Sequence, residues 1–158
     1  MTRTLKAARY ARDVDPRFIA FLTDTLPYLS FNEAMTFYSE YVPTLTPSEL
    51  ALLGCNDRFF LLTGLCNRVD MIHPWIYDRS REVEADPDNY LDLWARGHGK
   101  SSNISFAGCI QEVLCNPEIC IGIFSNTKDI AKPFLSQIKE ELERNEDLIR
   151  LYPDVLYA

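Results

Sequence analysis

Up to about residue 85, apolar residues recur at the three- and four-residue spacing of helices that bury one face. The clearest helix start is Thr46-Pro47-Ser48-Glu49, where an N-cap residue is followed by a Pro and, three residues on, by a Glu. The polar stretch Asp86-Pro87-Asp88-Asn89 marks the end of this region. We therefore predict a helical region over residues 1–88, with helices around 18–26, over 31–41 with Asn32 as a possible cap, from Thr46 onward, and over 71–83.

Beyond this boundary the pattern changes to alternating strand and helix. Tyr90–Ala95 predicts a short strand, and the apolar run Ile119–Phe124 is typical of a parallel strand buried on both faces. Ser101–Leu114 and Thr127–Asn145 each predict an amphipathic helix. The order strand, helix, strand, helix indicates an α/β fold in which residues 89–158 form a first βαβα unit with an incomplete parallel sheet.

The loop between the first predicted strand and its helix contains a phosphate-binding pattern, G-x-x-x-x-G-K-[ST]. Gly99-Lys100-Ser101 supplies its end, whereas Trp94 replaces the leading Gly and Gly97 keeps the turn permissive. A phosphate group must meet several backbone N–H groups at the positive end of a helix, so Cβ atoms must stay out of its way. We therefore predict that nucleotide phosphates bind to Arg96, Gly97, His98, Gly99, Lys100, Ser101 and Ser102.

Each polar residue of this loop has an expected role. Lys100 would reach the β- and γ-phosphates, and the Ser101 hydroxyl would ligate Mg²⁺. Arg96 would add a fork-shaped phosphate contact. The alternative is a Gly-rich turn at a helix start with an exposed Lys100. His98 is expected to be a loop residue rather than a catalytic base.

Composition narrows the class of protein. The 158 residues are 47% hydrophobic and 25% charged, as in soluble globular proteins, and no apolar run is long enough to cross a membrane. A net charge of −7 argues against a broad basic surface for nucleic acid. The five cysteines lack a C-x-x-C pair and are expected to be buried thiols in a reducing compartment. The start of the sequence has no apolar signal segment, which favours the cytoplasm.

Four basic residues recur every three positions near the N-terminus: Arg3, Lys6, Arg9 and Arg12. In a helix this spacing places them on one side. That side is either a solvated face or an arm that contacts phosphate groups.

Several segments resemble the large terminase subunit of tailed bacteriophages: His73–Tyr77, Arg81–Pro87, Leu91–Ser101, Ile121–Thr127 and Tyr152–Leu156. The resemblance covers roughly residues 50–158, and its most specific part is the deviant Walker A loop, with an Arg before Gly-x-Gly-Lys-Ser. It implies an ATPase that packages viral DNA into the procapsid in the host cytoplasm, with ATP and Mg²⁺ as cofactors. The implied partners are double-stranded DNA, the portal, the small terminase subunit and other copies in a ring.

The resemblance also implies roles for residues outside the loop. Ser125, Asn126 and Thr127 match the segment that couples nucleotide state to DNA in related translocases. An aromatic residue before the loop is expected to contact adenine, and Trp75 and Tyr77 are the candidates. Packing in the core is the alternative for both aromatic side chains.

The sequence lacks a recognisable hydrolytic motif. ATP hydrolysis needs an Asp at the end of an apolar strand and a Glu that activates water. After Lys100 the aspartates are Asp129, Asp147 and Asp154, and none follows four apolar residues. We therefore expect the N-terminal piece of a longer protein, inactive as an ATPase by itself and without the nuclease residues. The alternatives are a non-catalytic interaction or remnant protein that retains the loop, and a small-molecule P-loop kinase, disfavoured because about 90 residues precede the loop.

Overall fold

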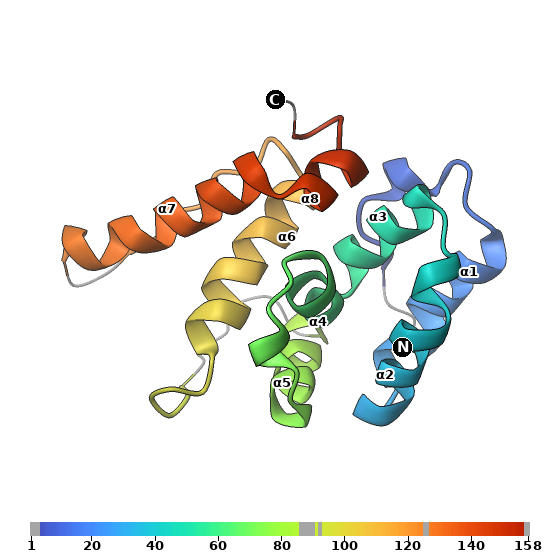
Figure 1. The fold of residues 1–158 in the computed structure, drawn as a ribbon, viewed down its shortest axis with the longest axis horizontal. Helices are drawn as coiled ribbons and strands as arrows, with labels where there is room; N and C mark the ends of the chain where they lie inside the picture. The colour runs from blue at the N-terminus through green and yellow to red at the C-terminus, as the bar shows by residue number, and fades with distance from the viewer. Residues whose placement is uncertain (1–3, 86–90, 92, 125–126, 157–158) are drawn as a thin grey trace.

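A computed structural model describes residues 4–85, 91, 93–124 and 127–156, and every regular element in these ranges is a helix. In Figure 1, α1, α2 and α3 lie on one side of the molecule, α6 and α7 on the other, and α4 and α5 between them. The α-helices are α1 (Pro16–Ala20), α2 (Phe31–Glu40), α3 (Pro47–Asn56), α4 (Arg58–Phe60), α5 (Pro74–Ala85), α6 (Gly108–Cys115), α7 (Lys128–Arg144) and α8 (Glu146–Leu151). Shorter 3₁₀ and π segments are η1 (Ala8–Ala11), η2 (Phe21–Thr25), η3 (Leu26–Tyr28), η4 (Val42–Thr44), η5 (Leu61–Leu65), η6 (Val69–Met71) and η7 (Ser101–Ala107).

Capping boxes set the starts of two helices. Thr46 Oγ1 accepts from the Glu49 N–H at 3.3 Å, and the Glu49 carboxylate accepts from the Thr46 N–H at 2.8 Å, which confirms the predicted start of α3. The same reciprocal pair joins Ser30 and Glu33 at α2. The cap of α2 is therefore Ser30, and the expectation of Asn32 is wrong. Each box satisfies backbone donors that have no acceptor inside the helix.

The predicted βαβα unit is wrong, since the described residues contain no β-strand. No backbone hydrogen bond joins the described residues of the two predicted strands. Leu91 and Leu93 are each 82% exposed and Phe124 is 95% exposed, although a parallel strand would bury such side chains. A strand is stable only where neighbouring strands satisfy its N–H and C=O groups, and the described remainder of this chain is helical and offers no such neighbour.

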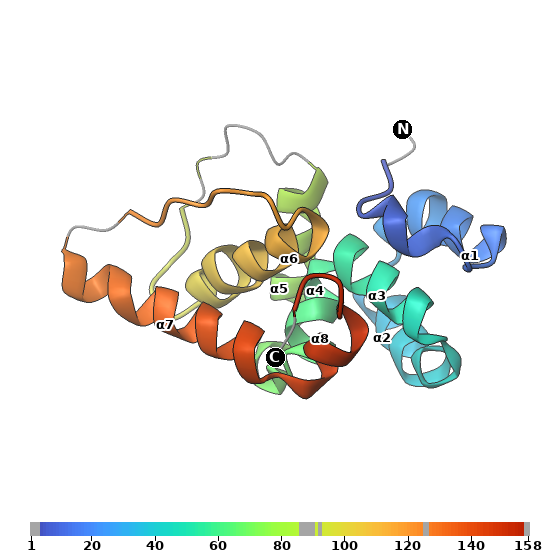
Figure 2. The same cartoon turned by 90° about the horizontal axis from the view of Figure 1, so that it is seen from above.

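The two helices of that unit do form, and they contact each other as a helical hairpin. Residues 101–115 are continuously helical through η7 and α6, and α7 covers 128–144. Figure 2 shows the connection that leaves α6 running along the molecule, and α7 then runs back in the opposite direction. Ile110 and Leu114 of α6 are fully buried, and Ile138 of α7 is 6% exposed.

One hydrophobic core joins residues from before and after position 88. Its largest fully buried side chains come from helices throughout the chain: Leu22, Leu26, Leu52, Leu53, Phe59, Leu61, Leu62, Tyr77, Ile110, Leu114, Leu148 and Tyr152. The segment after α8 is attached to this core, because the Tyr152 hydroxyl donates to the Ala51 carbonyl of α3 at 2.8 Å. Phe106, Ile110 and Leu114 place the helix that follows the Gly-rich loop in the same core.

A buried cluster of charges connects α4 to α5. The carboxylate of Asp57 is fully buried and accepts from Arg81 Nη2 at 3.0 Å and from the Phe60 N–H at 3.0 Å. Arg81 Nη1 lies 3.7 Å from Glu84 Oε2. Burial by itself would lower the pKa of the Arg81 guanidinium. The attraction of the Asp57 and Glu84 carboxylates is stronger than this effect, and the pKa is raised. The arginine therefore stays charged inside the protein.

The same cluster reaches α6. Glu84 Oε1 accepts from the Arg58 N–H at 3.0 Å and from Gln111 Nε2 at 3.0 Å. Arg58 Nε donates to Gln111 Oε1 at 3.1 Å. Because Gln111 belongs to α6, these bonds fix the position of that helix relative to α4 and α5.

Of the four N-terminal basic residues, the described Lys6, Arg9 and Arg12 do not share one helical face. Within residues 4–12, only Ala8–Ala11 is helical, as a 3₁₀ turn. Lys6 Nζ pairs with Glu112 at 3.1 Å, and Arg9 Nε pairs with Asp154 at 2.9 Å. Two of these side chains thus bind within the chain, while Arg3 lies outside the described residues.

Candidate nucleotide-binding site

Two glycines give the loop before α6 its shape. Gly97 has φ of 82° and Gly99 has φ of 74°, the left-handed region that favours glycine. A Cβ on Gly99 would lie 2.9 Å from Met71 Sδ and 3.1 Å from Ile76 Cδ1, whereas one on Gly97 would meet nothing within 4 Å. Gly99 therefore lets the loop pack on η6 and α5, and Gly97 leaves open space beside the backbone.

A helix begins directly after the second glycine. Its first hydrogen bond runs from the Asn103 N–H to the Gly99 carbonyl at 2.9 Å. The N–H groups of Ser101 and Ser102 come before this bond, at the end where a helix carries partial positive charge. Asn103 is fully buried and its Oδ1 accepts from Ser80 Oγ at 3.0 Å, which anchors this helix end on α5.

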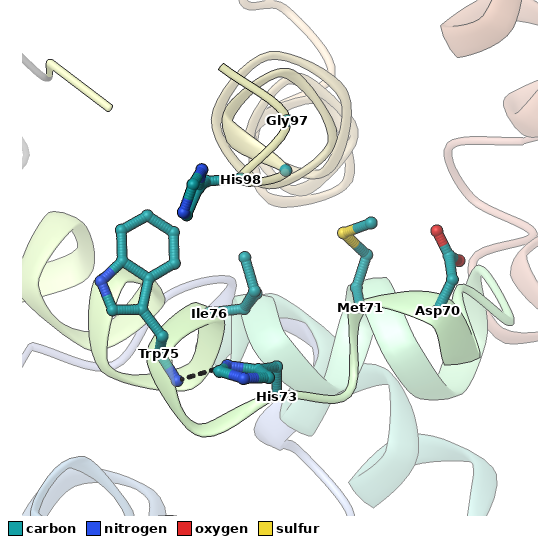
Figure 3. Close-up of a pocket in the computed structure, with 8 residues that line it drawn as sticks. Asp70, Met71, His73, Trp75, Ile76, Gly97 and His98 are labelled. Carbon is teal, nitrogen blue, oxygen red and sulfur yellow. Dashed lines mark hydrogen bonds between the residues drawn. The ribbon is translucent and has the colours of Figure 1, made fainter. Parts of the chain in front are cut away.

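Two hollows adjoin the loop. One, of about 480 Å³, is lined by Met71 and by residues 94–102. The other, also of about 480 Å³, is lined by Asp70, Met71, His73, Trp75, Ile76 and residues 97–99. Figure 3 shows this second hollow, with Met71 and Ile76 directed from below toward the loop. Both hollows have Gly97, His98 and Gly99 in their lining.

Aromatic rings cover one end of the loop. The Trp75 and Trp94 rings meet edge to face with centroids 4.6 Å apart, and the Trp75 and His98 rings lie 5.4 Å apart. Figure 3 shows the indole of Trp75 facing His98 beside the loop. His98 Nδ1 also lies 3.1 Å from the Arg96 carbonyl oxygen, which holds the ring over its own turn.

The structure separates the two aromatic candidates. Trp75 lines the hollow beside Gly97 and His98. Tyr77 is 1% exposed, and its hydroxyl donates to the Leu29 carbonyl at 2.7 Å in the core. The guanidinium of Arg81 lies 4.8 Å from the centre of the Tyr77 ring. Only Trp75 is therefore placed to meet a ligand at the loop.

Arg68 is a loop neighbour that the sequence analysis missed. Its Nε and Nη2 donate to the two Asp70 oxygens at 2.9 and 2.8 Å, and Nη2 also reaches Ser102 Oγ at 3.5 Å. The hydrogen bonds that Arg68 donates to Asp70 raise the pKa of Arg68 and lower the pKa of Asp70. No motif marks this arginine, because only the fold brings it next to the loop.

The remaining predicted residues are distributed as follows. Arg96 and Lys100 are exposed, and so is Ser101 in the first helical turn. Thr127 is the exposed N-cap residue of α7, while Ser125 and Asn126 lie outside the described residues. Residues 96–102 and Trp75 are thus brought together, and this cluster is the candidate site.

Mg²⁺ fits this cluster only as a companion of a bound phosphate chain. Within the described ranges, no three His, Cys, Asp or Glu side chains gather where they could hold a metal ion. The Ser101 hydroxyl is an exposed oxygen at the helix end, and phosphate oxygens and water would complete an octahedral shell.

Comparisons with protein-family models, with curated proteins and with solved structures find no match to this chain. Among the helices described, none has both the length and the apolar character needed to cross a membrane.

The two glycines give a matched pair of variants for testing the loop geometry. Both Gly97→Ala and Gly99→Ala place a Cβ at positive φ, which costs about 1–2 kcal/mol. Gly99→Ala also presses on Met71 and Ile76, and such overpacking adds about 1–3 kcal/mol. Urea unfolding should therefore show a lower midpoint for Gly99→Ala than for Gly97→Ala. Equal midpoints would contradict the packing of Gly99 against η6 and α5.

Proposed function

We propose that this chain binds the phosphates of ATP, together with Mg²⁺, at residues 96–102. The observation that carries the proposal is the pair of left-handed glycines directly before a helix that begins at Lys100. This arrangement exposes backbone N–H groups and the positive end of a helix to an incoming anion. Lys100 supplies a positive charge for the β- and γ-phosphates, and Ser101 supplies an oxygen for the metal ion.

Two further side chains complete the phosphate contacts. Arg96 is exposed at the start of the turn and can bind a phosphate through two parallel N–H donors. Arg68 lies next to Ser102, where its charge can add to that of Lys100 on a bound phosphate. The carboxylate of Asp70 neutralises part of that charge, so Arg68 acts as a secondary contact.

The nucleobase is proposed to stack on Trp75. Its indole lines the hollow that continues from the phosphate loop, and a flat apolar ring accepts any base face. The His98 ring lies edge to face with the indole at 5.4 Å in the same hollow. We assign no residue that would recognise adenine by hydrogen bonds.

The larger role follows from the resemblance to large terminases. We propose that the loop belongs to the ATP-driven motor that packages double-stranded phage DNA, acting with the portal, a small terminase subunit and further copies in a ring. Its place would be the cytoplasm of the infected bacterium. We assign no hydrolytic residue in this sequence, so the activity proposed for the chain itself is nucleotide binding.

Tryptophan fluorescence gives a direct test of binding. The chain has only two tryptophans, and both stand at the loop, so a bound nucleotide should change the emission. Titration with Mg²⁺-ATPγS should give a saturable change in the wild type and none in Lys100→Ala. The control is Lys139→Ala, which removes an exposed lysine of α7 and should behave as the wild type.

Two results would contradict the proposal. One is an equal saturable change in Lys100→Ala, which would locate binding elsewhere. The other is a flat titration in the wild type up to millimolar nucleotide, which is the result expected of a remnant that keeps the loop without using it.

A further inference from the structure

Two of the five cysteines meet across the contact between α3 and α6. Cys55 lies near the end of α3, and Cys115 is the last residue of α6, 60 positions further along the chain. The Cys115 thiol donates to the Cys55 carbonyl oxygen at 3.6 Å, which places its sulfur against the backbone of Cys55. Cys55 is fully buried, whereas Cys115 is half-buried. Neither thiol takes part in the candidate nucleotide site.

Two cationic side chains, Arg9 and Lys6, lie near Cys115. Arg9 Nη1 donates to the Cys115 carbonyl oxygen at 2.7 Å. The Lys6 ammonium is bound one turn away on α6, at Glu112, at 3.1 Å. Cations close to a thiol stabilise its thiolate, which is the form that reacts with oxidants. The carboxylates paired with these two cations, Glu112 with Lys6 and Asp154 with Arg9 at 2.9 Å, oppose this effect.

The two thiols are therefore unequal. The hydrogen bond from Cys55 lowers the pKa of Cys115 against the effect of its burial, and Lys6 and Arg9 lower it further. The same hydrogen bond, together with burial, raises the pKa of Cys55. Cys115 is thus the more acidic and the more exposed of the two thiols, and Cys55 is the enclosed partner.

We propose that Cys55 and Cys115 form a reversible disulfide when the protein meets a peroxide. The Cys115 thiolate attacks one oxygen of hydrogen peroxide and the O–O bond breaks, which gives a sulfenic acid on Cys115 and a hydroxide ion. The hydroxide takes up a proton and becomes one water. The Cys55 sulfur then attacks the sulfenic sulfur, the S–O bond breaks, and the Cys55 proton leaves with the hydroxide as a second water. Both cysteines are oxidised by one electron each, and hydrogen peroxide takes up both electrons. A dithiol such as dithiothreitol reverses the bond by exchange.

The disulfide would fix the C-terminal end of α6 to α3. Because α6 continues the helix that starts at Lys100, its far end would be held covalently to the N-terminal helices. Closing a loop of 60 positions restricts the unfolded chain strongly, so the oxidised protein should melt several degrees above the reduced protein.

Peptide mapping tests the proposal on the full chain. The wild type is treated with hydrogen peroxide, alkylated, digested without reduction, and analysed by mass spectrometry. We expect one major cross-linked species that joins the peptides of Cys55 and Cys115, lacks two hydrogens and disappears after dithiothreitol. Sulfinic acid on Cys115 without this cross-link, or a cross-link to Cys109 or Cys120 in its place, would overturn the proposal.

Matched variants separate the pair from the other thiols. Cys109→Ser and Cys120→Ser should keep the cross-link, and Cys120 is the stricter control because it is the exposed cysteine. Cys115→Ser should abolish the cross-link and the rise in melting temperature on oxidation. Circular dichroism checks that each variant is folded, and the map of the wild type decides the question even if Cys115→Ser does not fold. Persistence of the oxidation-dependent rise in a folded Cys115→Ser protein would contradict the pairing.

Discussion

Asp57→Ala is expected to lower the free energy of unfolding by about 3–5 kcal/mol, the range seen when one partner of a buried ion pair is removed. The carboxylate is fully buried, and the Arg81 side chain paired with it at 3.0 Å is 11% exposed. Without Asp57, the guanidinium would keep its charge beside Glu84 alone, at 3.7 Å. The substitution also removes the acceptor for the Tyr38 hydroxyl, which binds Asp57 at 2.5 Å.

Urea unfolding followed by circular dichroism measures this loss. The matched control is Glu140→Ala, which breaks the Arg144–Glu140 pair at 2.9 Å on the exposed face of α7. Exposed pairs of this kind contribute little, so the control should unfold close to the wild type. If Asp57→Ala and Glu140→Ala had the same midpoint, the buried cluster would not stabilise the fold.

Local signals in the sequence were sufficient to predict where several helices begin. A capping box depends on residues within one turn, so Thr46 and Glu49 gave the start of α3 correctly. Ser30 and Glu33 carry the same signature at the start of α2, so the sequence also contained the information that Ser30, and not Asn32, is the cap. Helix extents were also close, because apolar spacing records which face is buried.

The strand predictions were wrong because the pairing of one strand with another is not a local property of the sequence. The run Ile119–Phe124 is apolar enough for a buried strand, but burial there depends on neighbours that residues far away must supply. In the described structure these neighbours are helices, and Phe124 is left 95% exposed. The apolar composition of Ile119–Phe124 predicted a strand wrongly, because composition does not show which neighbouring elements would cover this segment.

The candidate site was predicted where it depends on consecutive residues and missed where it depends on the fold. Gly97 and Gly99 were identified from spacing, and both have positive φ. The sequence alone could not decide whether Trp75 or Tyr77 faces the loop, since both are aromatic. They are two positions apart on α5, which turns their side chains about 200° from each other around the helix axis, so Trp75 faces the loop and Tyr77 the core. The contact of Arg68 with Ser102 bridges 34 positions and has no sequence signature.

The measurement that tests the nucleotide site most directly is thermal unfolding with and without Mg²⁺-ATPγS. A ligand present at about a hundred times its Kd adds roughly 2.7 kcal/mol to the stability of the folded state. We expect a rise of this size in the wild type and in Lys139→Ala, and none in Lys100→Ala at the same nucleotide concentration. An equal rise in Lys100→Ala, or no rise in the wild type at saturating nucleotide, would contradict phosphate binding at the loop.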